Sequence, residues 1–418
     1  MQTQKGNTRA VAPVTETPIQ ALVRSWKQSR AVSQEKRARK AAEAEVRWQK
    51  DIVRVHGGVD KIMLGIILLL VAFGTVMVFS ASYYYSISKE GTPYYYLTRD
   101  IIFVMIGTVC FMFAAMIDYH KWRKWAIPAL LLSTVLLCIL LVPSLPFVVS
   151  LNGKARWIGV GPVTVMPGEI AKAAVILCVA AWLSRKPNMI LSIKKGILPM
   201  FVLMGFICGL IGINNAITAA TVAVIIIGMM FIAGMKIKYL VSIIGLGSAA
   251  FAGLIILEPY RMKRVTSFLD PFADPRGAGY QVVQSLLALG SGGLFGKGLG
   301  RSVQKTLYLP EPQNDFIYAI IGEEIGYIGL LLLLLAYLLL IWRCVHISMN
   351  APDLFGTLLG SGITIMLAVQ VIMNVMVVTS MLPPTGIILP FISWGGNALL
   401  IFMGAMGIML NISRQMPR

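Results

Sequence analysis

Residues 316–341 read FIYAIIGEEIGYIGLLLLLLAYLLLI, and this stretch indicates the fold class of the chain. Its second half contains only apolar residues and one tyrosine. A helix of this length extends about 39 Å, which exceeds the roughly 30 Å of hydrocarbon in a bilayer. The stretch also contains Glu323 and Glu324. Because adjacent residues of a helix point about 100° apart, we expect only one of these carboxylates to face the protein interior.

The rest of the chain repeats this apolar character. It is 57% hydrophobic and 13% charged, with a mean hydropathy of +0.76, and a water-soluble domain cannot bury so much apolar surface. The sequence therefore predicts an all-α polytopic membrane protein with about ten transmembrane helices between residues 62 and 412. The nine other predicted spans are about 62–82, 101–118, 126–142, 169–184, 197–213, 217–234, 240–257, 354–378 and 392–412.

The net charge of +19 follows mainly from orientation in the membrane. Residues 1–61 contain 13 Lys and Arg against 6 Asp and Glu, and the short loops near residues 121–124, 185–195 and 236–238 are basic. Since cytoplasmic segments carry the excess of Lys and Arg, we expect both termini in the cytoplasm, including the short tail 413–418. No nucleic-acid partner is needed to explain the charge. The N-terminal tail, partly helical or disordered, is either solvated beside anionic lipid or a docking site for a cytoplasmic partner.

The predicted orientation puts the loop of residues 258–315 on the extracytoplasmic side. It is too long for a simple connection, and its seven Lys and Arg residues suggest an anionic ligand. It contains two Asp-Pro pairs, beginning at Asp270 and Asp274. Asp-Pro is a typical helix start, because Asp accepts backbone N–H groups and Pro needs no donor. Either aspartate could be a cap, and YQVVQSLLALG (280–290) predicts a short helix at the membrane surface.

Two further motifs have both a structural and a functional interpretation. The segment GSGGLFGKGLGRS (290–302) is either a plain turn or a turn whose backbone amides approach a phosphate. Glu169 and Lys172 lie three residues apart in a predicted span, where charged side chains are rare and usually paired. They either form an ion pair that holds helices together or contact a ligand directly.

Several segments together resemble the SEDS family of shape, elongation, division and sporulation proteins. The resemblance covers about residues 62–412, and its motifs favour the division-type branch over the elongation-type branch. The segments that carry it are MVFSAS (77–82), YYYLTRD (94–100), ARWIGVGPVTVMPGEIAK (155–172), DPRGAGYQ (274–281), GKGLGRSVQKTLYLPEPQNDFIYAIIGEEIGYIG (296–329) and LPPTGIILPFISWGGNALL (382–400).

This resemblance implies a peptidoglycan glycosyltransferase of the bacterial cytoplasmic membrane. Such an enzyme polymerises lipid II, a disaccharide-pentapeptide on undecaprenyl pyrophosphate, at the outer membrane face. It implies a class B penicillin-binding protein as partner, other membrane proteins of the divisome, and a location at the division septum.

The resemblance also assigns candidate site residues. Asp274 occupies the position of the family's essential aspartate, which leaves Asp270 the structural role. We expect Asp274 to be the general base for the acceptor sugar's 4-hydroxyl or else a ligand of Mg²⁺ or Mn²⁺, and no organic cofactor is implied. A base at neutral pH needs a raised pKa, so we expect a partly desolvated carboxylate. The expected substrate-binding residues are Lys172, Glu169, Arg156, Arg264, Arg276, Gln281, Lys297, Arg301, Asp315 and Ser393.

Three motifs depart from the usual family pattern. The chain has MPGE (166–169) where QPSE is common, NNAIT (214–218) where PDLGT is common, and SWGGNA (393–398) in place of SYGGSS. Roles at these positions transfer less directly, whereas the Asp274 motif is intact. Trp157 and Trp394 are expected to be interfacial anchors in preference to sugar platforms.

Two other functions remain open from the residues alone. A lipid II flippase would also have polar residues in its spans. A non-catalytic divisome scaffold would need neither polymerisation nor lipid transport. A flippase requires a polar path to both faces of the membrane. A polymerase is favoured over these alternatives because the motifs whose residues could take part in catalysis cluster on one predicted face of the membrane.

Overall fold

The computed structural model describes residues 58–151, 154–160, 163–185, 190, 192–257, 259–277 and 279–416. The predicted N-terminal tail lies outside the described residues as far as residue 57. The predicted C-terminal tail is described to Met416, and its first two residues belong to the last helix.

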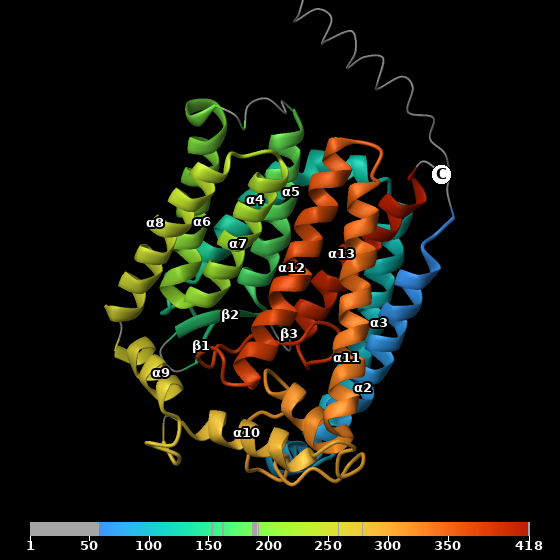
Figure 1. Ribbon diagram of the computed structural model, residues 1–418, viewed down its shortest axis with the longest axis vertical. Helices are drawn as coiled ribbons and strands as arrows, with labels where there is room; N and C mark the ends of the chain where they lie inside the picture. Colours follow the sequence, from blue (N-terminus) through green and yellow to red (C-terminus); the bar gives the residue numbers. More distant parts are fainter. Residues whose placement is uncertain are drawn as a thin grey trace, which may run out of the picture. The chain divides into compact units, whose positions relative to one another are not determined.

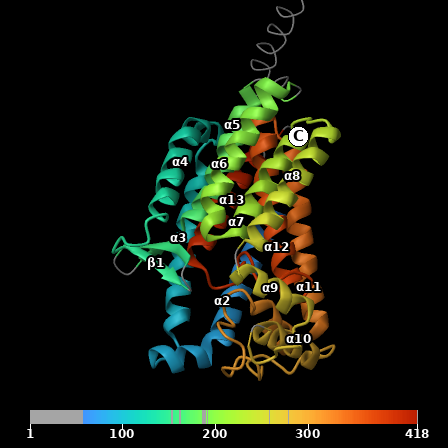
Figure 2. The ribbon, with the colours of Figure 1, turned by 90° about the vertical axis from the view of Figure 1, so that its left-hand side faces the viewer.

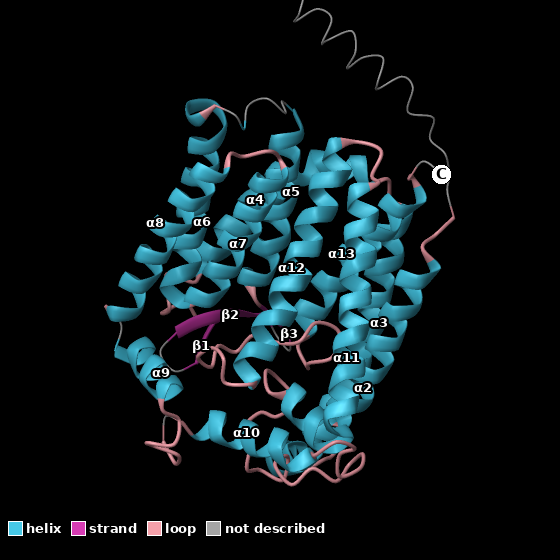
Figure 3. Ribbon diagram, in the orientation of Figure 1, coloured by secondary structure: helices cyan, strands magenta, loops and turns pink. Residues whose placement is uncertain are grey.

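A helix occupies each of the ten predicted spans, and the long helices run side by side (Figures 1 and 3). In the described chain, α2, α3, α4, α5, α11, α12 and α13 are long and apolar enough to cross a membrane, whereas the apolar stretches of α6, α7 and α8 are shorter. The chain is therefore a polytopic helical membrane protein. The ten helices are α2 (Lys61–Glu90), α3 (Tyr95–Met116), α4 (Tyr119–Ile139), α5 (Pro167–Arg185), α6 (Leu198–Asn214), α7 (Ala216–Ile232), α8 (Ile237–Ile256), α11 (Ile317–Met349), α12 (Leu354–Val378) and α13 (Gly396–Arg414).

The outward surface of the long helices is apolar, as a lipid-facing surface requires. Leu69 of α2, Met105 of α3 and Leu332 of α11 are all more than half exposed. The interior is also apolar and contains large fully buried side chains such as Phe355 and Phe402. Exposing this apolar outer surface to water would cost free energy, so lipid must be the solvent there.

Capping residues set the ends of several helices. The Asp60 carboxylate accepts a hydrogen bond from the Met63 amide at 2.9 Å, and Asp60 also pairs with Arg343 of α11. Asp118 and Asp353 cap α4 and α12 in the same way. Each carboxylate satisfies amides that have no partner in the first turn of a helix.

Close helix packing depends on glycines that leave room for a neighbouring backbone. Gly407 of α13 faces the Phe111 carbonyl of α3, and Gly74 of α2 faces the Phe391 carbonyl. A methyl group at either position would overlap that carbonyl oxygen. Small residues therefore let these elements approach closely, as is typical of membrane helices.

A three-stranded antiparallel sheet, which the sequence analysis did not predict, lies between α4 and α5. It consists of β1 (Val148–Leu151), β2 (Lys154–Val160) and β3 (Val163–Val165) in the order β1-β2-β3. The backbone pairs Val149 with Trp157 and Ile158 with Val165, and Asn397 of α13 donates a hydrogen bond to the Thr164 carbonyl at 2.8 Å. The sheet is thereby joined to the helix bundle.

The long loop of residues 258–315 forms two helices, α9 (Pro259–Leu269) and α10 (Tyr280–Gly292). They lie at the same end of the helix bundle as the sheet, and Figure 2 shows α9, α10 and β1 at that end from a second direction. The predicted helix after Asp274 is confirmed as α10. Its N-cap is Gly279 with no side-chain hydrogen bond, so capping by Asp274 is wrong.

Candidate functional site

A cavity of about 590 Å³ lies where the sheet, α9 and α10 meet the ends of the long helices. Six of the ten predicted substrate-binding residues line it, although they come from distant parts of the sequence. They are Arg156 of β2, Glu169 and Lys172 of α5, Arg264 of α9, Gln281 of α10 and Asp315 before α11. The cavity has cationic and anionic side chains in its wall, so it suits a ligand that carries both negative charge and hydroxyl groups.

A buried ion pair forms the wall contributed by α5. The ammonium of Lys172 lies 2.8 Å from the Glu169 carboxylate and donates a hydrogen bond to Oε1 of Gln370 in α12 at 2.7 Å. The predicted pairing of Glu169 with Lys172 is thus confirmed. Because all three side chains line the cavity, the pair both links helices and is placed to contact a ligand.

Arg264 and Asp315 lie on the side of the cavity formed by α9 and the start of α11. The Arg264 guanidinium donates a hydrogen bond to the Pro384 carbonyl at 2.7 Å. Burial, and to a lesser degree the neighbouring Glu311 carboxylate, raises the pKa of Asp315 to about 6, although Arg264 and Arg156 oppose this shift. The cavity wall therefore contains a carboxyl group that keeps its proton to a higher pH than an ordinary aspartate.

The two Asp-Pro pairs differ in the folded loop. The Asp270 carboxylate accepts hydrogen bonds from the amides of Phe272 and Ala273 at 3.2 and 3.1 Å. Its role is structural, but it stabilises a turn and does not cap a helix as expected, since residues 271–277 form turns and bends. The Asp274 side chain is exposed and lies over Gly277, where a methyl group would overlap its carboxylate. Asp274 does not line the cavity, and the expected partial desolvation is wrong for this structure.

Asp274 is nevertheless close to the cavity along the chain. Arg264 of α9 precedes it and Gln281 of α10 follows it, and both line the cavity. The loop is tight, because Gly279 lies directly against the Pro271 carbonyl and its amide donates to the Asp274 carbonyl at 3.1 Å. The loop thus presents an accessible carboxylate between two elements of the cavity wall.

Four predicted substrate-binding residues do not line the cavity. Arg276 and Arg301 are exposed elsewhere on the loop. Lys297 pairs with Glu323 at 2.6 Å, and the Ser393 hydroxyl accepts a hydrogen bond from the Leu389 amide at 2.8 Å. Local sequence could not reveal these assignments, because they depend on partners from other segments.

Part of the glycine-rich segment 290–302 supports α11 through its backbone amides. The amides of Lys297 and Gly298 donate to the carbonyls of Glu323 and Glu324, both at 2.9 Å. These bonds form at a kink in α11, where Gly326 has a φ of 78° that favours glycine. These bonds give the motif a structural role at the kink of α11.

Both Glu323 and Glu324 are buried, which corrects the expectation that only one faces inward. Glu323 contacts Lys297, whereas Glu324 contacts Lys305 at 2.6 Å and the Ser80 hydroxyl of α2 at 2.8 Å. Two directions on one helix are buried because the 290–310 segment contacts both carboxylates and α2 also contacts Glu324. The adjacent acids thereby join the extended loop to the helix bundle.

Several residues of the cavity wall were not predicted from the sequence. Arg99 of α3, Glu311 and Gln370 line it, and so do Trp157 and Trp394, which were expected to be interfacial anchors. Gln370 could have been predicted to line a cavity, because a polar residue in the middle of an apolar span usually faces the protein interior or water. The tryptophans carry no local signal that distinguishes a cavity wall from a membrane interface.

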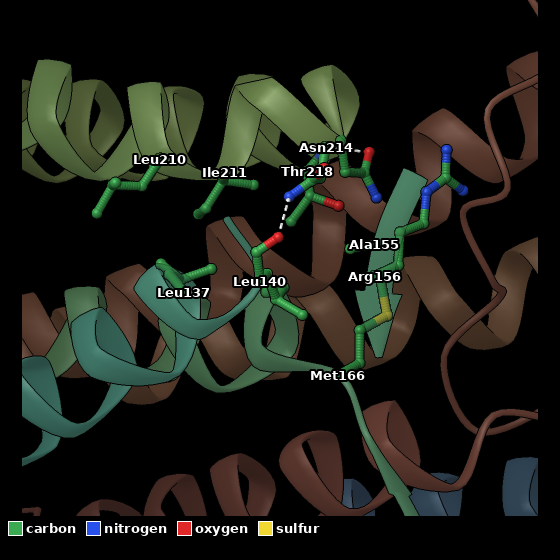
Figure 4. Close-up of a pocket in the computed structure, with 11 residues that line it drawn as sticks. Leu137, Leu140, Ala155, Arg156, Met166, Leu210, Ile211, Asn214 and Thr218 are labelled. Carbon is green, nitrogen blue, oxygen red and sulfur yellow. Dashed lines mark hydrogen bonds between the residues drawn. The ribbon is translucent and has the colours of Figure 1, made fainter. Parts of the chain in front are cut away.

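A second, much smaller cavity of about 20 Å³ is lined by residues of the NNAIT segment, which departs from the usual family pattern. It lies among α4, β2, α6 and α7, and Asn214 donates a hydrogen bond across it to the Leu140 carbonyl at 3.3 Å (Figure 4). Asn215 caps α7 by accepting from the Thr218 amide at 3.1 Å. The two amides thus hold helix ends. The Arg156 side chain extends away from the leucines of this pocket (Figure 4).

Known proteins resemble this chain over most of its length. The family of FtsW, RodA and SpoVE, described as cell cycle proteins, matches residues 60–417. The chain belongs to this family. Within the FtsW/RodA/SpoVE family, stage V sporulation protein E of Bacillus subtilis (strain 168) is 41% identical over 356 residues, covering 85% of this chain and 97% of that protein. The probable peptidoglycan glycosyltransferase FtsW of Geobacter sp. (strain M18) is 39% identical over 363 residues, covering 86% and 98%.

Solved structures show the same fold in the FtsW/RodA/SpoVE family. The rod shape determining protein RodA of Thermus thermophilus has a TM-score of 0.63 at 24% identity, covering 86% of this chain and 98% of that chain. A chain from a structure described as "Structural coordination of polymerization and crosslinking by a peptidoglycan synthase complex" has a TM-score of 0.70 at 24% identity, covering 85% and 98%.

The described residues contain no group of three His, Cys, Asp or Glu side chains that could hold a metal ion. A divalent cation at Asp274 would therefore take most of its ligands from a bound substrate or from water. Mg²⁺ is commonly bound in this way, through one or two carboxylates and phosphate oxygens.

Proposed function

We propose that this protein is a peptidoglycan glycosyltransferase that polymerises lipid II at the outer face of the bacterial cytoplasmic membrane. The observation that carries the proposal is the 590 Å³ cavity, whose wall contains Lys172, Arg156 and Arg264 next to the loop of Asp274. A lipid-linked pyrophosphate needs cations, and a sugar hydroxyl needs a base, within one site. In this proposal the three shorter helices α6, α7 and α8 span the membrane together with the seven longer ones, both termini are cytoplasmic, and the 258–315 loop is extracytoplasmic.

The reaction joins the 4-hydroxyl of an acceptor sugar to the anomeric carbon of a donor, whose lipid pyrophosphate leaves. Asp274 accepts the hydroxyl proton, while the cations of the cavity wall stabilise the negative charge on the departing pyrophosphate. Asp274 is exposed before substrate binds. The acceptor itself then covers the carboxylate and removes water from it, which increases its strength as a base.

A divalent cation, Mg²⁺ or Mn²⁺, is a compatible addition to this site. When bound, it would neutralise charge on the pyrophosphate. The Asp274 carboxylate would hold it together with phosphate oxygens of the substrate and water molecules, which are the preferred ligands of such ions. No other step depends on it.

We further propose that the protein acts at the division septum with a class B penicillin-binding protein and other membrane proteins of the divisome. The FtsW names of several relatives support division, and the neighbouring structure of a peptidoglycan synthase complex supports pairing with a crosslinking enzyme. The partner would crosslink the peptides of the strands made here.

The test is polymerisation of fluorescent lipid II by the purified protein with its cognate penicillin-binding protein in liposomes. We expect Asp274→Asn to abolish glycan synthesis and Asp270→Asn, the same change four residues earlier in the same loop, to retain it. Full synthesis by the Asp274 variant would refute the catalytic role. If the wild-type pair makes no glycan but moves lipid II between leaflets, the protein is a flippase. If it does neither and still recruits the crosslinking enzyme, it is a scaffold.

A further inference from the structure

The outer ends of α2 and α3 carry two tyrosine triplets, residues 83–85 and 94–96, which the proposed reaction does not use. The α2 helix has 30 residues and is about 45 Å long, roughly 15 Å more than the hydrocarbon thickness. Its first turn is held at the opposite end by the pairing of Asp60 with Arg343. Its last turns, with the first triplet, therefore project to the level of the lipid headgroups or beyond.

Two of these tyrosines present open ring surfaces. Tyr94 is 59% exposed, and its ring lies parallel to that of Phe79, with centroids 5.9 Å apart and planes at 3°. Phe79 thus packs parallel to the Tyr94 ring, while more than half of the Tyr94 surface stays exposed. Tyr84 is 42% exposed and packs edge-on against Tyr83, with ring centroids 5.3 Å apart. The result is a supported aromatic surface with hydroxyl groups at its rim.

The neighbouring tyrosines of both triplets form a second ring cluster, which reaches the wall of the large cavity. The Tyr96 ring contacts the Tyr95 ring at 5.2 Å and the Trp394 ring at 5.0 Å. The Arg99 guanidinium lies over the Tyr95 ring at 4.4 Å from its centroid. Trp394 and Arg99 both line the cavity. The exposed Tyr84 and Tyr94 belong to a different ring cluster, with Phe79 and Tyr83. The two clusters adjoin along the chain, because Tyr84 and Tyr94 directly precede Tyr85 and Tyr95, and together they form an aromatic array beside the proposed reaction site.

We propose that Tyr84 and Tyr94 bind the growing glycan strand as it leaves the cavity. This inference rests on the proposed function, since the ligand is its polymeric product. The C–H face of a pyranose ring is apolar while its hydroxyls need hydrogen-bond partners, and an exposed tyrosine side chain offers both a ring and a hydroxyl group. The array also ends in the positive charge of Arg99, which complements the carboxylates of the peptide stems.

Contacts far from the reacting end have a specific consequence for a polymerase. They slow dissociation of the strand between additions without changing the bond-forming step. The surface should therefore determine the length of the product and leave the rate of lipid II consumption unchanged. Tyrosines that only anchor a helix at the membrane interface would have no such effect.

The test uses the Tyr84→Ala/Tyr94→Ala double variant with the partner enzyme in liposomes. We expect strands shorter by about 5- to 50-fold, from the loss of two aromatic contacts, with lipid II consumption within about twofold of the wild type. Tyr84→Phe/Tyr94→Phe keeps the rings and should restore most of the length. Tyr327→Ala on α11, which removes a tyrosine that is 62% exposed outside this array, is the matched control.

A binding measurement separates this inference from the proposed function. The purified proteins are titrated with a fluorescent, uncrosslinked glycan fragment, and the double variant should bind it about 5- to 50-fold more weakly than the wild type. Wild-type strand length and wild-type affinity in the double variant would overturn the inference while the glycosyltransferase stands. An equal loss of folded protein in the double variant and the Tyr327 control would assign the tyrosines to the membrane interface. Absence of polymerisation by the wild type refutes the function itself.

Discussion

The Lys172 ammonium donates a hydrogen bond to Gln370 across the boundary between α5 and α12, at 2.7 Å. The same ammonium lies 2.8 Å from Glu169 on its own helix. One cation thus holds two helices together and neutralises a carboxylate in the wall of the large cavity. This part of the site is at once a structural joint and a charged surface for the substrate.

Removal of the Lys172 charge should therefore reduce stability as well as activity. Lys172→Ala leaves the Glu169 carboxylate buried without its cation, which should cost about 3–5 kcal/mol in the free energy of unfolding. Glu169→Gln/Lys172→Met removes both charges, so it should recover much of that stability and none of the polymerisation. Thermal unfolding in detergent and lipid II polymerisation measure the two effects. Restored activity in the double variant would show that the pair is structural only.

Gly277 should be needed for the position of Asp274. A methyl group at residue 277 would overlap the Asp274 carboxylate, which can move because it is exposed. We expect Gly277→Ala to lower the polymerisation rate by about 10- to 100-fold, since small displacements of a reacting group have effects of this size. Gly290→Ala is the control, because nothing lies within 4 Å of the added methyl group. A melting temperature that falls together with the rate would point to a misfolded loop instead.

The two ion pairs of α11 should differ in strength. Lys305 is almost fully buried with Glu324, whereas the Lys297 side chain, paired with Glu323, is 34% exposed. Lys305→Ala should cost about 3–5 kcal/mol because it leaves a buried charge unpaired. Lys297→Ala should cost only about 1 kcal/mol, since Glu323 keeps hydrogen bonds from hydroxyl and amide groups. Unfolding midpoints in detergent would rank the two variants, and equal midpoints would contradict this ranking.

Asp315 should make stability depend on pH. Its folded-state pKa of about 6 lies above the ordinary value of 3.8, so the folded state binds its proton more tightly than the unfolded state. Stability contributed by this group is then complete below the ordinary value and is lost as pH rises from about 4 to about 6. Asp315→Asn should therefore stabilise the protein more at pH 7.5 than at pH 4.5, by about 1–2 kcal/mol. A stability difference that does not change with pH would show that Asp315 remains as solvated as in the unfolded chain.

Several elements followed directly from the sequence. The ten apolar stretches became ten helices, and the residues after Asp274 became α10, because helix length and apolar spacing are local properties. The pairing of Glu169 with Lys172 is also local, since residues three apart share a helix face. The sheet was missed because its strands are short and its apolar residues resemble those of the neighbouring spans.

The sequence by itself determined the polytopic helical class, the family and the motif that contains Asp274. Those conclusions depend on hydrocarbon thickness and on short contiguous patterns. Only the tertiary structure decided which charged residues share a cavity, because Arg156, Arg264 and Asp315 come from three distant segments. It also assigned Lys297 to Glu323 and left Asp274 exposed at the margin of the site. A charge in a membrane protein takes its role from the partner that the fold brings to it, and that partner is rarely a neighbour in the sequence.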